Sequence, residues 1–295
     1  MRKYKRFNIT WKIAIRKRQK SFFDSEVEFI VLSNPKNGWI ADPFLFEYGN
    51  STFIFAERWD YSQQKGVISY CKYDGNMNVV WKDILEEEWH LSYPFVWSDE
   101  EGFHILPEAA ESNQLYYYTA IEFPDIWKRD KKICTGRFAD STLQFVKDNN
   151  YIYSYSMNGV KGRLYRSKID FHQPTNLEWE FITKDPRIAR PGGSFIEDMG
   201  TVYRIAQDCS ASYGEKIVAI KIYEDIEGYH EEVEKEISFR DVRVPTKKGL
   251  IGTHTYNRTD KYEVIDLRYF GFNYKDFISY RWHELKKWLK TTKEN

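Results

Sequence analysis

A strand-turn-strand unit around Asp42 constrains this chain more than any other feature, because the unit recurs along the sequence. Residues 37–57 read as two strands joined by a turn at Gly49 and Asn50, which tolerate the positive φ angles of a tight hairpin. Pro43 cannot donate a hydrogen bond to a neighbouring strand, and it biases the preceding residue toward an extended conformation. We therefore expect an extended Asp42, with its carboxylate at the start of the strand.

Four further copies of this unit follow, each weaker than the first. Pro94 and Glu108 are fourteen residues apart, as are Pro43 and Glu57. The five copies begin at Asp42, Tyr93, Asp140, Arg190 and His254. A spacing of about 50 residues is the length of a four-stranded propeller blade. The sequence thus predicts an all-β fold, a five-bladed β-propeller over residues 1–272. Chance similarity among strand-turn-strand pieces is the alternative.

The two ends of the chain differ from the repeats. Residues 10–16 alternate with period two, which predicts a strand that joins the last blade and closes the ring. The first twenty residues hold nine Lys or Arg and no acid, and they either face solvent or attract anionic lipid.

Residues 273–295 predict a short amphipathic C-terminal helix. Its apolar residues recur at helical spacing between basic ones, and they are Phe277, Ile278, Trp282, Leu285, Trp288 and Leu289. Such a helix either docks on the propeller rim or lies on a membrane surface.

Composition excludes several classes of function. Equal numbers of basic and acidic residues, 44 each, provide no overall positive field and disfavour nucleic-acid binding. Three scattered cysteines without a C-x-x-C spacing argue against a disulfide framework and against a zinc site. The sequence shows neither a long apolar run nor a signal-peptide pattern. We expect a cytoplasmic protein, located at the inner face of the membrane if its helix binds lipid.

The starts of the blades are the candidate functional residues. The inner strand of each propeller blade begins at the mouth of the central channel, so these residues should converge there. Carboxylates, imidazoles and a guanidinium suit acetal chemistry on a sugar, which needs a base, an acid and cations for any phosphate. The candidates at or beside the starts are Asp42, His90, Ser92, Tyr93, Asp140, Arg190 and His254, and those after the second strands are Glu57, Glu108 and Asp208.

Each candidate also has a structural interpretation. Asp42 can cap a turn before Pro43, and Glu57 or Glu108 can pair with an arginine between blades. The sequence lacks a Walker loop, G-x-G-x-x-G, H-E-x-x-H, G-x-S-x-G and a D-x-D pair. It therefore indicates no metal and no cofactor.

Seven segments between residues 39 and 257 resemble a known family. The most specific are Trp-His-Leu-Ser-Tyr-Pro at 89–94 and Gln-Asp-Cys-Ser at 207–210. They resemble the propeller domain found at the N-terminus of plant glucosamine inositolphosphorylceramide transferase and in bacterial surface-polysaccharide loci. More distantly, the layout is similar to five-bladed glycoside hydrolases that act on arabinosides, xylosides and fructosides.

The resemblance implies roles for particular residues. Asp42 matches the blade 1 base or nucleophile of those hydrolases, and Asp140 matches the blade 3 aspartate that orients it or tunes its pKa. The blade 4 general-acid glutamate has no clear counterpart, and Asp208 is the nearest acid. The absence of that glutamate favours a phosphate leaving group. Arg137, Arg190 and His254 would supply positive charge for it.

Three functions are compatible with these residues. The leading hypothesis is a glycosyltransferase of surface polysaccharide or glycolipid synthesis. It would take a nucleotide-linked or phosphate-linked sugar donor and a glycan or lipid-linked acceptor, with Asp42, Asp140 and Asp208 as catalytic residues. The alternatives are a glycoside hydrolase that uses Asp42 and Asp140, and a non-catalytic glycan-binding propeller.

Overall fold

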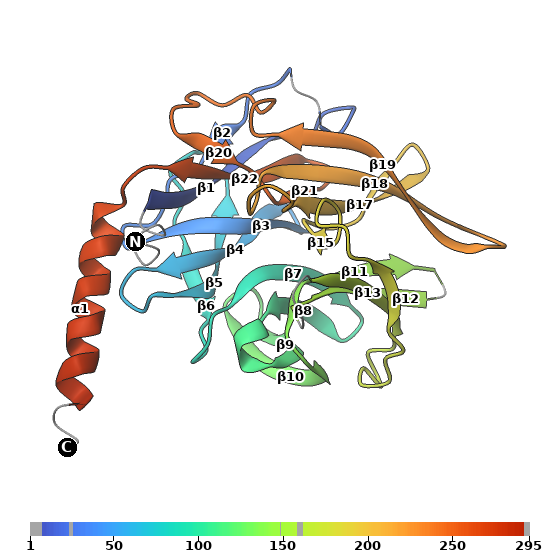
Figure 1. Ribbon diagram of the computed structural model, residues 1–295, viewed down its shortest axis with the longest axis horizontal. Helices are drawn as coiled ribbons and strands as arrows, with labels where there is room; N and C mark the ends of the chain where they lie inside the picture. The colour runs from blue at the N-terminus through green and yellow to red at the C-terminus, as the bar shows by residue number, and fades with distance from the viewer. Residues whose placement is uncertain (1–7, 24–25, 148, 158–161, 292–295) are drawn as a thin grey trace.

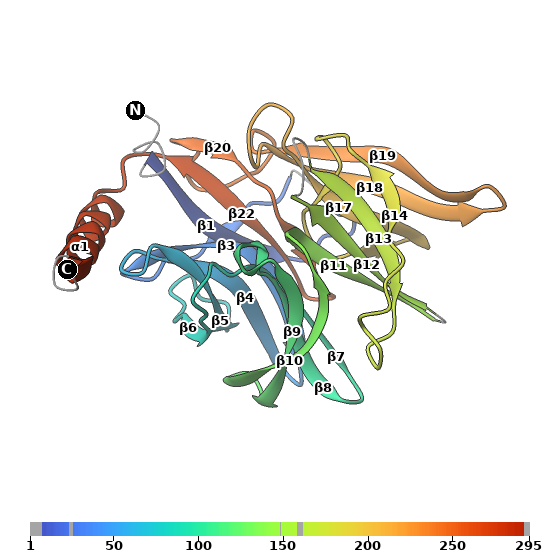
Figure 2. The ribbon, with the colours of Figure 1, turned by 60° about the horizontal axis from the view of Figure 1, so that its bottom comes forward.

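The computed structural model describes residues 8–23, 26–147, 149–157 and 162–291, and it shows five antiparallel sheets arranged as the blades of a propeller (Figures 1 and 2). Blade 1 contains β3 (Gly38–Tyr48), β4 (Ser51–Asp60), β5 (Lys65–Tyr73) and β6 (Lys82–Leu85). Blade 2 contains β7 (Ser92–Asp99), β8 (Gly102–Glu108), β9 (Gln114–Glu122) and β10 (Ile126–Thr135), with the 3₁₀ turn η2 (Ala110–Ser112) between β8 and β9. Blade 3 contains β11 (Phe138–Val146), β12 (Asn149–Ser156), β13 (Arg163–Ile169) and β14 (Glu180–Thr183).

The last two blades have a divided inner strand. Blade 4 contains β15 (Arg190–Pro191), β16 (Ile196–Asp198), β17 (Thr201–Asp208), β18 (Lys216–Asp225) and β19 (Gly228–Ser238). Blade 5 contains β20 (Leu250–Gly252), β21 (Tyr256–Arg258) and β22 (Tyr262–Phe270), followed by β1 (Ile9–Lys17) and β2 (Ile30–Val31) from the start of the chain. The predicted five-bladed propeller is confirmed.

The N-terminal strand closes the ring, as predicted. β1 pairs with β22 in antiparallel register from Ile9 opposite Phe270 to Lys17 opposite Tyr262. A buried ion pair between Arg16 and Glu263, with 2.7 Å between nitrogen and oxygen, lies across this seam. The first and last parts of the chain are therefore joined by backbone hydrogen bonds and by a desolvated charge pair.

Each inner strand is interrupted near the axis. In blades 1 to 3 the pairing register shifts at one equivalent place, where Asp42, Tyr93 and Asp140 have φ angles of 50°, 45° and 48°. In blades 4 and 5 the inner strand is split in two at that place. The extended conformation expected for Asp42 is thus wrong. A bulge there turns the side chain out of the strand's alternation, and the Asp42 N–H donates to Asp266 Oδ2 (3.2 Å) instead of to a neighbouring strand.

Aromatic side chains pack between the blades. The Phe44 ring of blade 1 meets the Tyr93 ring of blade 2 edge to face, with 4.8 Å between centroids. Phe55 and Ile105 belong to a second cluster between the same two blades. Burying side chains of this size contributes about 2 kcal/mol each, which explains why a chain with 20 Phe and 22 Tyr can hold its sheets face to face.

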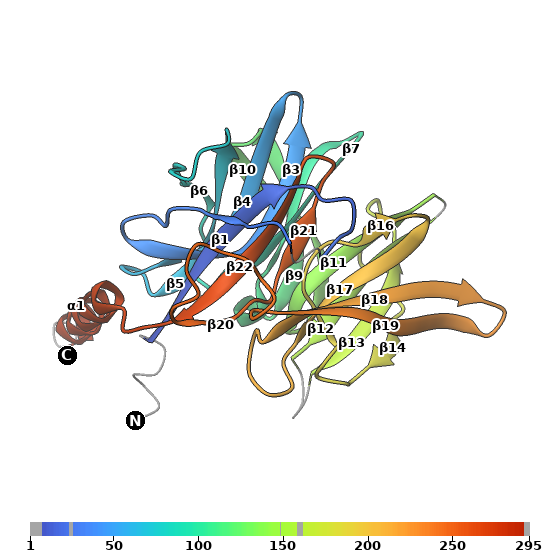
Figure 3. The same ribbon diagram turned by 90° about the horizontal axis from the view of Figure 1, so that it is seen from above.

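Helix α1 (Tyr274–Thr291) stands outside the ring (Figures 1 and 3). The predicted C-terminal helix is confirmed. Asn273 caps its first turn, since Asn273 Oδ1 accepts the Asp276 N–H at 3.1 Å. Among the described residues, no helix is both long enough and apolar enough to cross a membrane. Residues 1–7 and 292–295, which include part of the predicted basic N-terminal run and the end of the tail, lie outside the described residues.

Candidate active site

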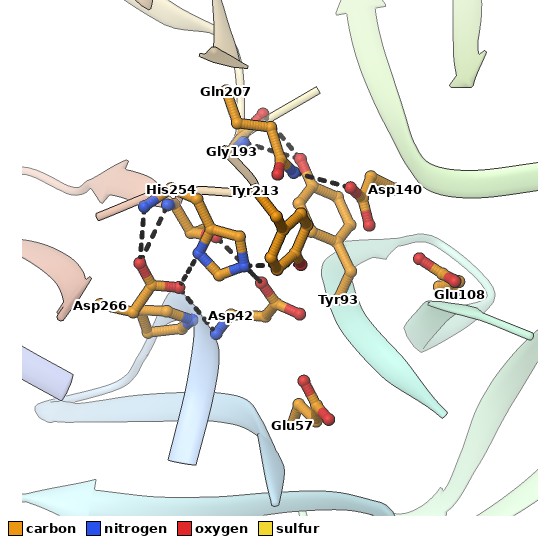
Figure 4. A network of polar contacts seen from close by, with 12 residues as sticks. Asp42, Glu57, Tyr93, Glu108, Asp140, Gly193, Gln207, Tyr213, His254 and Asp266 are labelled. Carbon is orange, nitrogen blue, oxygen red and sulfur yellow. Dashed lines mark hydrogen bonds and ion pairs between the residues drawn. The ribbon is translucent and has the colours of Figure 1, made fainter. Parts of the chain in front are cut away.

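A cavity of about 450 Å³ opens where the inner strands are interrupted. Four blades contribute to its wall, and three of the five predicted blade starts, Asp42, Arg190 and His254, line it. The predicted residues on this wall are Asp42, Glu57, His90, Ser92, Glu108, Arg190 and His254. Figure 4 shows most of the charged groups in and beside this cavity.

Asp42 is a buried carboxylate in a left-handed bulge of β3. Thr255 Oγ1 donates to Asp42 Oδ1 at 3.0 Å, and His254 Nε2 lies 3.3 Å from the same oxygen. Burial raises the pKa of Asp42 to about 6, although the charge of His254 pulls it down. A carboxylate whose pKa is near the working pH can both accept and release a proton.

His254 is held between two carboxylates. Its Nδ1 lies 2.5 Å from Asp266 Oδ2, its Nε2 faces Asp42 and Tyr213, and its ring stacks on Trp11 with 4.3 Å between centroids. Burial alone would lower the pKa of His254, but the charges of Asp266 and Asp42 outweigh this effect and raise the pKa. The imidazole is thus kept charged and fixed in orientation.

Asp266 organises this part of the site. It is fully buried on β22, and its carboxylate accepts the backbone N–H groups of Asp42, His254 and Thr255 as well as contacting the imidazole. One side chain therefore ties the interrupted inner strands of blades 1 and 5 together. The sequence pattern did not single out Asp266 as a site residue.

Glu57 and His90 form a second group on the cavity wall. Burial, followed by the charges of Asp42 and Glu108, raises the pKa of Glu57 well above its usual range. His90 Nδ1 accepts the Gly66 N–H at 2.8 Å, which places the proton of a neutral imidazole on Nε2, 3.6 Å from Glu57 Oε1. Burial also lowers the pKa of His90, so the neutral ring is favoured.

Glu108, Asp140 and Arg190 form a third group. Arg190 Nε donates to Asp140 Oδ2, its Nη2 lies 3.5 Å from Glu108 Oε2, and Gln207 Nε2 donates to Asp140 at 2.7 Å. Burial and the neighbouring Asp140 raise the pKa of Glu108 well above its usual range, and Arg190 offsets this only in part. The carboxylate of Asp140 is thus paired with Arg190, whereas burial favours the protonated form of Glu108.

Four predicted residues lie apart from the cavity wall, namely Asp140, which contacts Arg190 of that wall, and Tyr93, Asp208 and Arg137. The Tyr93 hydroxyl is buried in contacts with Thr142 Oγ1 (2.8 Å) and the Gly193 N–H (2.7 Å), where it joins blades 2, 3 and 4. Asp208 accepts the Ser210 N–H at 2.8 Å and thereby caps the turn after β17. Arg137 is exposed between β10 and β11. The structure gives Tyr93 and Asp208 structural contacts, and it places Arg137 away from the carboxylates.

Aromatic rings on the wall are the feature that sequence reasoning missed. Trp39 and Trp59 are parallel, with 5.6 Å between centroids and 7° between planes, and both line the cavity. Trp11 of the N-terminal strand β1 and Tyr213 of blade 4 line the same cavity. Flat rings beside carboxylates are surfaces on which a sugar ring can stack through its apolar face. The pairing of residues 39 and 59 across a predicted hairpin was the available signal.

One group of residues could also hold a metal ion. The ligand atoms of Asp42, His254 and Asp266 lie within 4.8 Å of one another, and all three residues are buried. The two ring nitrogens of His254 already lie against the two carboxylates, and its raised pKa favours a charged ring, which competes with a cation for both of them. The contacts fit a hydrogen-bonded triad better than they fit an ion site.

Comparison with known proteins assigns the chain to a family. The model of the family described as "Glucosamine inositolphosphorylceramide transferase 1, N-terminal" matches residues 29–267. Glucosamine inositolphosphorylceramide transferase 1 of Arabidopsis thaliana is 30% identical over 223 residues, which are 72% of this chain and 28% of that protein. The protein of the same name from Oryza sativa subsp. indica is 27% identical over 221 residues, 71% of this chain and 29% of its own length. The chain thus spans less than a third of the curated relatives it matches.

Solved structures agree on the fold. A thermostable family-43 glycoside hydrolase superposes with a TM-score of 0.55 at 13% identity, covering 81% of this chain and 93% of its own. An endo-1,4-beta-xylanase from Bacteroides thetaiotaomicron gives a TM-score of 0.52 at 15% identity, covering 74% and 79%. At such identities the likeness concerns the propeller alone. The match over residues 29–267 is what decides membership, and the chain belongs to the family of glucosamine inositolphosphorylceramide transferase N-terminal domains.

Proposed function

We propose that this protein is a glycosyltransferase that moves a sugar from an activated donor to an acceptor hydroxyl in the axial cavity. The observation that carries the proposal is the pairing of a base with acids on one wall. Asp42, with a pKa of about 6, is ionised near neutral pH. Burial favours the protonated forms of Glu57 and Glu108 beside it. Two carboxyl groups held in opposite protonation states are what acetal chemistry at one carbon requires.

The proposed step uses these groups in defined roles. Ionised Asp42 accepts the proton of the attacking hydroxyl while the new bond from the acceptor oxygen to the anomeric carbon forms. The bond from that carbon to the leaving oxygen breaks at the same time, and Glu57 or Glu108 gives its proton to the leaving oxygen. His254, oriented by Asp266, stabilises the ionised form of Asp42 until the proton arrives.

The choice of transfer over other chemistry rests on the family. The relatives that match this chain bear the name of a transferase acting on an inositolphosphorylceramide, although the chain corresponds to only part of their length. We propose accordingly that the donor is a nucleotide-linked or phosphate-linked sugar and that the acceptor is a lipid-linked glycan. Arg268 is a cation on the wall that could meet a donor phosphate, whereas His254 is held between Asp42 and Asp266.

Glycoside hydrolysis is the second candidate, and a specific observation favours it. Arg190 is already occupied by Asp140 and Glu108, so less positive charge is open to a phosphate than the sequence suggested. The protonated Glu57 and Glu108 also provide the general acid that seemed to be missing, which an alcohol leaving group needs more than a phosphate does.

A single set of assays separates the candidates. The purified full chain is incubated with nucleotide sugars and with aryl glycosides, each with and without glycan acceptors, in isotopically labelled water. Transfer yields an extended acceptor, hydrolysis yields free sugar carrying the label, and a binding module yields neither. Asp42→Asn should abolish either reaction, whereas Asp208→Asn, a change of a buried aspartate outside the cavity, serves as the matched control. Turnover that survives Asp42→Asn would overturn the assignment of this cavity.

A further inference from the structure

Helix α1 is attached to the propeller by its polar side. Ser279 Oγ donates to the Tyr61 carbonyl at 2.6 Å, and Gln64 Nε2 donates to Asp276 Oδ1 at 2.7 Å. His283 Nδ1 lies 3.2 Å from the Ser62 carbonyl. All of these contacts reach the turn between β4 and β5.

The apolar side of α1 faces away from the propeller. Tyr274 is 65% exposed, Trp282 60% and Trp288 60%, and Ile278, Leu285 and Leu289 are exposed as well. A helix on a soluble domain normally turns its apolar stripe toward the core. Here the orientation is reversed, and Figures 1 and 3 show the helix projecting from the ring beside β4 and β5. Docking of the helix on the propeller rim therefore explains its polar contacts. It does not explain why the apolar stripe is exposed.

We propose that α1 is a membrane-binding helix that lies on a bilayer containing anionic lipid. Lys275, Arg281 and Lys286 are exposed, and Glu284 is the one exposed acid among the described side chains of the helix. Two exposed tryptophans suit the region between head groups and acyl chains, where an amphipathic ring is most stable. A stripe of this kind with a surplus of basic residues is the pattern of interfacial helices, and it complements a negatively charged surface.

A hollow beside the helix extends this surface toward the cavity. It has a volume of about 700 Å³, and apolar Ile278 and Trp282 line it together with Lys36 and Lys275. An acyl chain can contact the apolar part while a lipid phosphate meets the two lysines. Asp276 of the same helix lines the axial cavity. The helix thus connects a lipid surface with the candidate active site, so that a lipid-linked substrate can enter from the bilayer; this last step rests on the proposed function.

Vesicle flotation of the full chain tests the proposal without requiring turnover, so its result is independent of the proposed function. The probes are phosphatidylcholine vesicles with and without a third of phosphatidylglycerol. Trp282→Ser combined with Leu285→Ser removes two exposed apolar side chains from the stripe. The matched control is Met199→Ser combined with Ile226→Ser, which removes two apolar side chains, 94% and 104% exposed, from turns of blade 4.

We expect the wild type and the control to float with the anionic vesicles and to stay behind with the neutral ones. The Trp282→Ser/Leu285→Ser variant should lose binding about tenfold or more, with an unchanged melting temperature. Leu285→Glu alone serves as a second variant should the double change impair folding. Absence of flotation by the wild type, or equal flotation by all variants, would overturn the proposal. A wild-type dimer that the helix variant dissociates, without lipid binding, would assign the stripe to a second copy instead.

Discussion

Asp42 combines a left-handed backbone with a buried carboxyl group, and the equivalent residues Tyr93 and Asp140 share that backbone conformation. A non-glycine residue in the left-handed region costs about 1–2 kcal/mol, and Asp and Asn tolerate it best. The Thr255 hydroxyl and the His254 imidazole then keep one carboxylate oxygen in place. Such local cost is typical of positions where the surrounding structure fixes a functional side chain.

The first prediction concerns this residue directly. Asp42→Asn should lower turnover by about a thousandfold, because the amide cannot accept the proton of an attacking hydroxyl. The melting temperature should stay within a few degrees, since Asn keeps the left-handed backbone and can still accept the Thr255 hydroxyl. Steady-state kinetics and thermal unfolding measure both quantities, with Asp208→Asn as the control that should keep its turnover. A large drop in melting temperature with normal kinetics would make Asp42 a structural residue.

The raised pKa of Asp42 also predicts how stability depends on pH. Its folded-state pKa of about 6 lies above the usual 3.8, so the native state binds this proton more tightly than the unfolded chain does. The associated stability is fully present below pH 4 and is lost as the pH rises through about 6, with an upper limit of about 3 kcal/mol. Urea unfolding of the wild type and Asp42→Asn across this range isolates the effect. The difference between the two free energies of unfolding should change in that window and be flat above pH 7.

The site residues at the repeat starts could be predicted from the sequence, but Asp266 and Gln207, which hold two of them in place, could not. Asp42 and His254 came from the repeat, because equivalent positions of a propeller converge. Asp266 and Gln207 are not at repeated positions. Each contacts groups that become available only where one particular inner strand is interrupted. Tyr93 shows the opposite case. It occupies a repeat start, but its ring is long enough to reach the Gly193 backbone and fills the space between blades instead of facing the cavity.

At the scale of elements, the repeat identified the first two strands of each blade. These strands carry the alternating apolar pattern of a half-buried sheet, whereas the outer strands vary in length, with four residues in β6 and in β14 and eleven in β19. In blade 1 the outer strand β6 begins at Lys82, directly after Trp81. Trp81 Nε1 donates to the Ser33 carbonyl, so a contact with a loop near blade 5 overrides the local propensity.

The closing strand provides a prediction at this scale. Arg16 and Glu263 are both buried across the β1–β22 seam, so Arg16→Ala would remove the nearer cation of Glu263 and leave it with Arg258, whose Nε lies 3.5 Å from Oε1. We expect a loss of about 3–5 kcal/mol in the free energy of unfolding. Denaturant unfolding measures it, and Arg18→Ala, whose partner Asp260 is exposed, is the matched control with an expected loss below about 1 kcal/mol. Equal losses for the two variants would show that the seam does not depend on the buried pair.

At the scale of the whole molecule, the repeat determines the five-bladed architecture, and the two ends of the chain add residues to the cavity wall. Trp11, from the strand that closes the ring, stacks on His254 and forms part of the cavity wall. Asp276, from the helix beyond the last blade, lines the same cavity. Sequence periodicity reports on blades, so it could not place these two residues beside the blade starts. The orientation of α1 was also open, because its apolar stripe alone does not say which side makes the contacts.

The helix gives the last prediction, since it belongs both to the cavity and to the proposed lipid surface. A chain ending at Phe272 should still fold, because the five blades close without the helix, and its melting temperature should fall by only a few degrees. It should lose vesicle binding, and it should also lose part of its activity on a soluble substrate. The second effect follows because Asp276 leaves the cavity wall and Gln64 loses one of its contacts. The Trp282→Ser/Leu285→Ser variant separates the two effects, since it should keep activity on a soluble substrate while losing the vesicles. Full soluble activity in the truncated chain would show that Asp276 does not shape the site, and aggregation of that chain would show that the helix shields the propeller.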